Sequence, residues 1–260
     1  MGPGARGGPP EGWPADVSAS AHLFVASATD LADAVTVGGE DGHHLARVLR
    51  LRAGETVTVA DGSGVWRPYR VAEVAAAVVH LEAAGAIQQE PAPSERLAVA
   101  FALTKGGKPE LVVQKLTELG VDRIVPVLGE RSVSRPDPDR AGAAAERWRR
   151  IAWEASRQCR RATLPAVEDL APLAGLSGHP GLVVAERGGL PAEGLGSPPG
   201  DEILVVVGPE GGLTDPEVDA LKPWARLDLG PHILRAETAA LAAAALLAAR
   251  RLGSGGGSPT

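Results

Sequence analysis

The stretch ILVVVGPEGGLTDPE occupies residues 203–217 and contains the main features of the fold in a single run. Five apolar residues in succession, Ile203–Val207, predict a strand that is buried on both faces. Gly208, Gly211 and Gly212 allow the following loop to turn sharply and approach a ligand closely, although a plain strand-to-helix turn is the alternative. Thr214 with Asp215, Pro216 and Glu217 predicts the start of a helix. This order of strand, loop and helix is the unit of a parallel α/β sheet.

The same alternation extends over residues 91–252, which we expect to form one α/β domain with helices on both faces of a parallel sheet. The other predicted strands are Leu97–Leu103, Arg123–Leu128, Gly181–Ala185 and Arg226–Leu229. The predicted helices are Pro109–Leu119, Asp139–Arg161, Asp215–Leu221 and Ala236–Leu252. The last of these is nearly all Ala and Leu, so we expect it to be buried, either within the chain or partly in a dimer interface.

Ligands of such sheets bind beyond the carboxyl ends of the strands. The sequence lacks the dinucleotide fingerprint G-x-G-x-x-G after a strand, the P-loop, the G-x-S-x-G elbow and the zinc motif H-E-x-x-H. His43 and His44 are adjacent, so on a helix they would point in different directions, and we expect no metal site.

The N-terminal part has a different pattern. Short strands predicted at His22–Val25, Thr56–Asp61, Val65–Val74 and Val78–Ala83, with a helical piece at Gly42–Leu51, indicate a small barrel or sandwich over residues 21–90. Residues 1–20 and 253–260 are rich in Gly, Pro and Ser or Ala, and we expect them to be disordered tails.

Charge and composition narrow the class of protein. One Cys excludes a disulfide framework, and the absence of a signal peptide or a bilayer-length apolar run favours the cytoplasm. The net charge of −6 argues mildly against a nucleic-acid partner. The segment from Arg131 to Arg161, however, contains nine Arg and only four acidic residues. This excess of positive charge is suited to phosphate binding, and a solvated helix face is the alternative.

Two C-terminal motifs resemble the RsmE family, the uridine N3-methyltransferases of 16S ribosomal RNA within the SPOUT superfamily. They are VVGPEGGLT at residues 206–214 and LGPHILRAETA at residues 229–239. Residues 115–121 and 151–161 resemble helices of the same family, and His44 with Val48-Leu49-Arg50 resembles its PUA-like β-barrel. The resemblance covers about residues 22–252.

The resemblance implies an α/β SPOUT domain with a C-terminal trefoil knot, preceded by a PUA-like barrel that helps to hold RNA. It implies S-adenosylmethionine as cofactor, ribosomal RNA or the small ribosomal subunit as partner, and a homodimer packed through the knots. The residues expected to bind the cofactor are Ala185, Glu186, Gly188, Val207, Gly208, Pro209, Gly211, Gly212, Leu229, Gly230, Ile233, Leu234 and Thr238.

Methylation of uridine N3 requires loss of a proton and stabilisation of the resulting negative charge. We expect Glu210 to orient the base or accept the proton, and Arg235 to stabilise the charge; a loop-stabilising carboxylate is the alternative for Glu210. The residues expected to bind RNA are Arg47, Arg50, Arg52, Lys105, Lys108, Arg157, Gln158, Arg160 and Arg161. For the barrel arginines and the two lysines, a solvated surface is the alternative.

The sequence departs from the family pattern at His232, where Arg is usual, and at Arg157, where an acid is frequent. Two rival functions remain: a SPOUT methyltransferase acting on another ribosomal or transfer RNA site, and a non-catalytic RNA-binding assembly factor. Only the second predicts that no cofactor binds.

Overall fold

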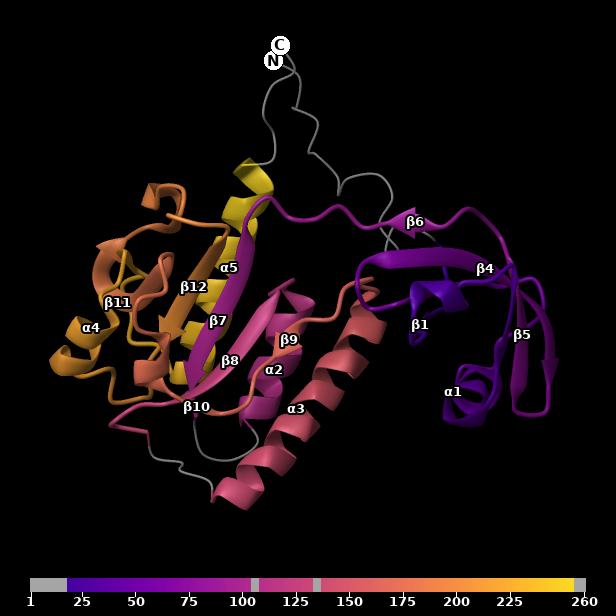
Figure 1. Ribbon diagram of the computed structural model, residues 1–260, viewed down its shortest axis with the longest axis horizontal. Coiled ribbons are helices and arrows are strands. Elements are labelled where there is room, and N and C mark those ends of the chain that lie inside the picture. Colours follow the sequence, from indigo (N-terminus) through magenta and orange to yellow (C-terminus); the bar gives the residue numbers. More distant parts are fainter. Residues whose placement is uncertain (1–17, 104–107, 133–136, 255–260) are drawn as a thin grey trace, which may run out of the picture. The chain divides into compact units, whose positions relative to one another are not determined.

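The computed structural model describes residues 18–103, 108–132 and 137–254 (Figure 1). The chain divides into two compact units. One comprises the residues up to Ala92 together with Ser156–Leu164, and the other comprises Pro93–Ala155 and the residues from Pro165 onward. The division differs from a single boundary near residue 90, because the C-terminal end of a long helix packs with the N-terminal unit.

The N-terminal unit is built on one six-stranded sheet. Its strands are β1 (Ala21–Phe24), β2 (Ala34–Val37), β3 (Thr56–Ala60), β4 (Val65–Ala75), β5 (Val78–Ala83) and β6 (Gln88–Gln89). The order is β1-β3-β4-β5-β2, with β6 beside β4; only the pair β1–β3 is parallel. All described strands of the unit belong to this sheet, which excludes a two-sheet sandwich among them.

Alternating apolar residues of this sheet bury one core, which includes Leu23, Val57, Tyr69 and Leu81. The predicted helix at Gly42–Leu51 begins earlier than expected: α1 spans Gly39–His43 and a π-helical turn follows at His44–Val48. The strands β2 and β6 were not predicted. β2 is a half-exposed edge strand and β6 has only two residues, so neither carries a strong apolar pattern.

The C-terminal unit contains a seven-stranded, wholly parallel sheet. Its strands are β7 (Arg96–Ala102), β8 (Arg123–Leu128), β9 (Ala166–Val167), β10 (Ala171–Pro172), β11 (Leu182–Leu190), β12 (Glu202–Val207) and β13 (Ala225–Leu227). The order is β10-β8-β7-β12-β11-β13, with β9 beside β8. The predicted fold class, a parallel α/β sheet preceded by a small β domain, is confirmed.

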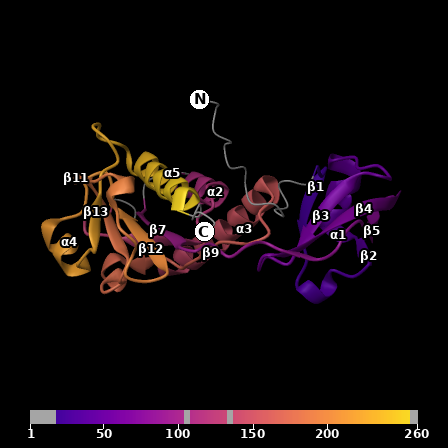
Figure 2. The ribbon, with the colours of Figure 1, turned by 90° about the horizontal axis from the view of Figure 1, so that it is seen from above.

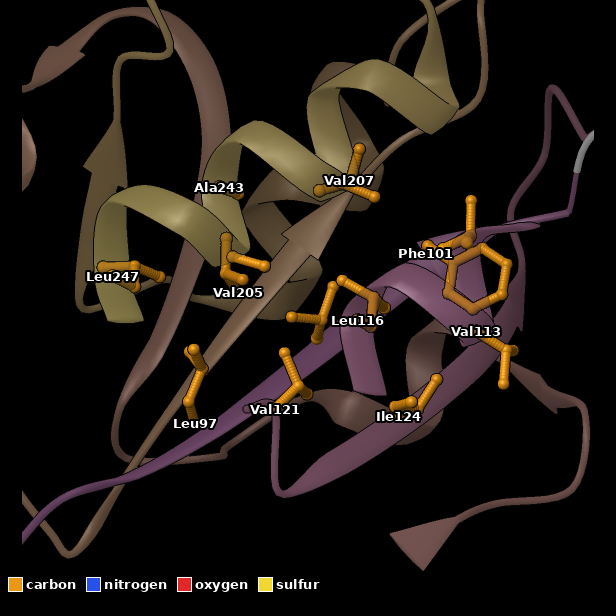
Figure 3. Packing of buried hydrophobic residues seen from close by; sticks show 14 of the residues in the cluster. Leu97, Phe101, Val113, Leu116, Val121, Ile124, Val205, Val207, Ala243 and Leu247 are labelled. Atoms are coloured by element: carbon orange, nitrogen blue, oxygen red, sulfur yellow. The ribbon is translucent and has the colours of Figure 1, made fainter. Parts of the chain in front are cut away.

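Four α-helices accompany this sheet among the described residues: α2 (Lys108–Glu118), α3 (Pro138–Cys159), α4 (Asp215–Leu221) and α5 (Ala236–Ser254). Leu97, Val205 and Ile124 point from one face towards Leu116 of α2 and Leu247 of α5 (Figure 3). Ala98, Val125 and Leu204 point from the other face and pack with Leu221 of α4. Both faces are therefore covered, as the continuous apolar strands predicted.

Helix α5 runs beside α2 over the sheet (Figure 2). It buries a single stripe of small residues and Leu247, including Ala240, Ala243 and Ala244, whereas Leu246 is 37% exposed. The prediction of a helix buried all round is therefore only half met within the described chain. The trefoil knot stays an expectation of the resemblance.

Candidate functional site

A segment within β11 and the two segments that follow β12 and β13 in the C-terminal unit line a pocket of about 350 Å³. The pocket lies beyond the carboxyl ends of these parallel strands, where the sheet topology predicts a ligand site. Its lining comprises Val184, Ala185, Glu186, Arg187, Val207, Gly208, Pro209, Glu210, Gly212, Leu213, Val218, Leu229, Gly230, His232, Ile233, Leu234, Ala236 and Ala239.

The first wall comes from an irregularity in β11. This strand was expected to end at Ala185, but it continues to Leu190 after a register shift, because both Ala185 and Leu190 pair with Leu227 of β13. Of the residues between them, Glu186 and Arg187 line the pocket. Gly189 permits the close approach, since a Cβ there would lie 2.7 Å from the backbone carbonyl carbon of Arg226.

The second wall is the loop Gly208–Gly212. The Gly212 N–H donates to the Pro209 carbonyl at 2.8 Å, and Gly212 has a φ of +70°, which L side chains rarely adopt. A Cβ at Gly208 would lie 3.0 Å from the Leu213 nitrogen, so this position is restricted by space. The helix start after the loop is confirmed: Thr214 caps α4 and forms a capping box with Glu217.

The third wall is the segment that begins at Leu229 after β13, and Asp228 joins it to the first wall. Its carboxylate accepts the Gly188 N–H at 2.9 Å and the Gly230 N–H at 2.8 Å. These two hydrogen bonds hold the pKa of Asp228 below its usual range. Asp228 lies inside the predicted strand Arg226–Leu229, so the apolar pattern does not reveal this role; an acid directly followed by Leu-Gly is the signal of a side-chain turn.

Most residues expected to bind the cofactor line the pocket; Gly188, Gly211 and Thr238 do not. The Gly211 carbonyl instead accepts a hydrogen bond from Arg131 at 2.7 Å. His232, one of the two departures from the family pattern, is in the lining.

A chain of alternating charges lies at the rim of the pocket. Lys108 Nζ, at the start of α2, is 3.1 Å from Glu237 Oε1 and 4.0 Å from Glu210 Oε1. The backbone N–H of Glu237 and the Lys108 ammonium lower the pKa of the Glu237 carboxyl, against its partial burial. The second carboxylate oxygen of Glu237 is buried without a hydrogen-bond partner among the described residues. Glu237 is therefore an ionised carboxylate that fixes Lys108 beside Glu210.

The two residues expected to act in catalysis are placed differently. Glu210 lines the pocket, whereas Arg235 is exposed just before α5 and outside the lining. The positive charge of Arg235 nevertheless favours the ionised form of Glu237. Glu186, also in the lining, pairs with Arg226 at 2.8 Å.

The arginines at the C-terminal end of α3 contact the N-terminal unit, to which they belong. Arg157 pairs with Asp41 at 2.9 Å, and Arg160 donates to the Ala19 carbonyl. The Arg161 carbonyl accepts a hydrogen bond from His22 Nε2 at 2.9 Å. Gln158 of the same segment is exposed. These contacts give Arg157 and Arg160 a structural role in the β domain, besides the RNA contacts that the resemblance implies.

The barrel arginines Arg47, Arg50 and Arg52 are exposed, and their guanidinium groups make no hydrogen bond or ion pair with any described residue. Lys108 is held by two carboxylates, as described above. Lys105 lies outside the described residues.

Within residues 18–103, 108–132 and 137–254, no three His, Cys, Asp or Glu side chains are grouped so that they could hold a metal ion. No helix in this part of the chain is long and apolar enough to cross a membrane.

Comparison with known proteins connects both units to RNA methylation. A family described as "RNA methyltransferase domain" matches residues 90–248, and one described as "RNA methyltransferase PUA domain" matches residues 37–76. The Ribosomal RNA small subunit methyltransferase E of Bacillus subtilis is 32% identical over 220 residues, covering 79% of this chain and 86% of that protein. The protein of the same name from Synechocystis is 34% identical, with 84% and 74% covered.

A solved structure supports the same relationship to the ribosomal RNA small subunit methyltransferase E proteins. The crystal structure of a Ribosomal RNA small subunit methyltransferase E from Neisseria gonorrhoeae bound to S-adenosyl methionine matches with a TM-score of 0.71 and 26% identity. The match covers 86% of this chain and 95% of that one. With two units of the expected kinds and relatives aligned along both, the chain belongs to the RNA methyltransferase family of the ribosomal RNA small subunit methyltransferase E proteins.

Proposed function

We propose that this protein transfers a methyl group from S-adenosylmethionine to N3 of a uridine in the 16S ribosomal RNA of the small subunit. The observation that carries the proposal is the pocket lined by a segment within β11 and by the segments after β12 and β13. Its volume lies at the small end of the range of ligand sites. The S-adenosylmethionine bound by the Neisseria gonorrhoeae relative gives the chemical identity of the cofactor.

The residues present fit such a cofactor. Val184, Val207 and Leu229 provide apolar walls for an adenine ring. Gly208 and Gly230 expose backbone groups that can hydrogen-bond the edge of the ring. The carboxylates of Glu186 and Glu210 suit a ligand that carries positive charge. When bound, the cofactor supplies an activated methyl group.

The rim residues are suited to the acceptor. Uridine N3 becomes nucleophilic when it loses its proton, and negative charge then spreads to the neighbouring carbonyl oxygens. Glu210 accepts that proton or orients the base, and Arg235 stabilises the charge on the uracil carbonyls. Lys108, held by Glu237, adds a second cation next to Glu210.

The enzyme acts as a homodimer in the cytoplasm, where its ribosomal RNA substrate is found. Support for the dimer comes from apolar residues that the described chain leaves exposed in the C-terminal unit. Ile233 is 85% exposed, Leu190 49% and Leu246 37%. Leu246 also borders a groove formed with Pro191, Asp228 and Pro231. A second copy of this unit would remove these side chains from water.

The test of the cofactor is calorimetric titration with S-adenosylmethionine. Ala185→Trp fills the pocket from its lining, and Ala220→Trp places the same bulk on the exposed face of α4 as a matched control. We expect micromolar binding by the native protein and the control, and none by Ala185→Trp. Absence of binding by the folded native protein would favour a non-catalytic RNA-binding factor.

The test of the substrate is nucleoside analysis after incubation with unmodified RNA. We expect N3-methyluridine in 16S ribosomal RNA and none in transfer RNA or 23S ribosomal RNA. A methylated base in another RNA would confirm methyltransferase activity but would assign a different substrate.

A further inference from the structure

The turn that follows β8, residues 129–132, is fixed by its own hydrogen bonds, and we call it the β8 turn. The Gly129 N–H donates to Ser132 Oγ at 2.9 Å, and the Ser132 N–H donates to the Gly129 carbonyl at 3.2 Å. Ser132 is only 7% exposed, so the hydroxyl that closes the turn is shielded from water. The two residues between them, Glu130 and Arg131, are exposed and start from a fixed base.

The β8 turn contacts the segment that follows β12 at two points. The backbone N–H of Glu130 donates to Glu217 Oε1 at 2.6 Å, in the first turn of α4. Arg131 Nη1 donates to the Gly211 carbonyl at 2.7 Å, within the loop Gly208–Gly212. The partners are 87 and 80 positions apart in the sequence, so both contacts depend on the fold.

Glu217 is shared between the β8 turn and the start of α4. While Oε1 accepts from Glu130, Oε2 accepts the Thr214 N–H at 2.8 Å. Burial opposes ionisation of Glu217, but the N–H groups of Thr214 and Glu130 and the charge of Arg131 hold its pKa below the usual range. A Cβ at Gly129 would lie 2.9 Å from Glu217 Oε1, so the contact requires a glycine there. One ionised carboxylate therefore ties the β8 turn to the end of the loop.

Gly211 is the point at which Arg131 meets the loop. A Cβ at Gly211 would lie 3.3 Å from Arg131 Cδ and 3.6 Å from Arg131 Cβ, and its φ is outside the left-handed region. The glycine is thus required by the arginine side chain and not by the backbone conformation. Gly211 itself does not line the pocket, but its neighbours Glu210 and Gly212 do. A displacement of the Gly211 carbonyl is therefore passed directly to the ligand site.

We propose that Arg131 is a positioning residue for the cofactor, and that its hydrogen bond to the Gly211 carbonyl holds the loop Gly208–Gly212 in the conformation that binds S-adenosylmethionine. A guanidinium group donates a charge-assisted hydrogen bond, which is stronger than a neutral one. Three glycines give the free loop many conformations, so a contact that fixes the loop lowers the entropy cost of binding. The identity of the ligand rests on the proposed function; the contact itself does not.

Hydrogen exchange without any ligand tests the contact. Arg131→Ala should speed exchange of the Gly212 N–H, which donates to the Pro209 carbonyl within the loop, by about tenfold. Arg70→Ala is the matched control, because Arg70 is also an exposed arginine whose Nη1 donates to a glycine carbonyl, that of Gly54 at 3.2 Å, in the N-terminal unit. The control should leave this exchange at its native rate. Native exchange in Arg131→Ala would overturn the proposal.

Calorimetric titration and steady-state kinetics test the consequence for the cofactor. Arg131→Ala should weaken S-adenosylmethionine binding about tenfold, and Arg131→Lys, which keeps the charge and a donor, about threefold. In methylation of 16S ribosomal RNA, the KM for the cofactor should rise in proportion, while kcat at saturating cofactor stays within about twofold. Lower RNA affinity with an unchanged cofactor KM would overturn the proposal and place Arg131 on the RNA. If the native protein bound no S-adenosylmethionine, the proposed function would fail, and the exchange experiment would still decide whether Arg131 holds the loop.

A double-mutant cycle tests whether Gly211 acts through Arg131. Gly211→Ala alone crowds the Arg131 side chain and should weaken cofactor binding about fivefold. In the Arg131→Ala background the added methyl group no longer meets that side chain, so little further loss is expected. Additive losses would show that the two residues act separately and would contradict the proposed coupling.

Discussion

Acidification below pH 6.5 should destabilise the N-terminal β domain through a single histidine. His22 is 4% exposed, and its two ring nitrogens lie 2.7 Å from Thr58 Oγ1 and 2.9 Å from the Arg161 carbonyl oxygen. The carbonyl can only accept, so Nε2 carries the hydrogen and Nδ1 accepts from the Thr58 hydroxyl. The neutral ring is therefore fully satisfied without a second proton.

Burial lowers the pKa of His22 from 6.5 to about 4, and the charges of Arg157 and Arg160 act in the same direction, against the hydrogen bond to Arg161. In the unfolded chain the ring takes up a proton near pH 6.5, whereas the folded domain excludes it until about pH 4. The stabilisation is complete above pH 6.5 and is lost as the pH falls through this window. At about 1.4 kcal/mol per pH unit, the full loss is about 3 kcal/mol.

Urea unfolding between pH 6.5 and pH 5, followed by hydrogen exchange in peptides of β1 and β3, measures this loss locally. Carboxylates with ordinary pKa values contribute mostly below that range. Burial raises the pKa of Glu90, whose protonation opposes the loss equally in the native protein and the control. His22→Gln is the control, because an amide can still donate to the Arg161 carbonyl but does not titrate. We expect the native domain to lose about 2 kcal/mol over this interval and the variant to lose much less. Equal losses in the two proteins would refute the assignment to His22.

Three further changes test the pocket and its rim. Asp228→Asn should weaken S-adenosylmethionine binding more than tenfold in calorimetry, since an amide oxygen does not replace a carboxylate that accepts from two loops; unchanged affinity would show that the loops hold without it. Glu237→Gln should lower the methylation kcat about tenfold and leave cofactor affinity within about twofold, because Lys108 loses its closest anion; equal losses of both would indicate a collapsed pocket instead. Thr214→Ala should cost about 1 kcal/mol in the unfolding of the C-terminal unit by removing the cap of α4; no change in calorimetric melting would mean that this cap does not contribute.

The sequence predicts an element correctly where the pattern of its own residues determines its structure. Ile203–Val207 reads as a strand buried on both faces, and β12 pairs with β7 on one side and β11 on the other. The pocket follows from the general rule that parallel strands present their carboxyl ends together. The shape of the pocket, however, also depends on a register shift in β11, which arises from the pairing of β11 with β13. Two residues of one strand pairing with the same partner cannot be read from the spacing of apolar residues.

Side-chain roles are harder to predict when the partner lies far away in the sequence. Arg157 and Arg160 stand in a segment with an excess of positive charge, which suggests phosphate binding. In the structure their partners include Asp41 and the Ala19 carbonyl, more than a hundred residues away. Arg147 pairs with Glu110 at 3.5 Å, and Arg149 pairs with both Glu146 and Asp169 at 2.7 Å. Much of the local excess is thus neutralised inside the protein.

Whether an arginine is already paired also affects how well it can bind RNA. A guanidinium group that already pairs with a carboxylate must break that pair to bind a phosphate, so its net contribution to affinity is small. Arg47, Arg50 and Arg52 have no such pair to lose among the described residues, and they lie within six residues of the sequence. The segment from Arg131 to Arg161 contains more arginines, nine against three, but several of them already have partners within the protein. We therefore expect the arginines without partners to contribute more to RNA binding than the larger cluster that composition alone would select.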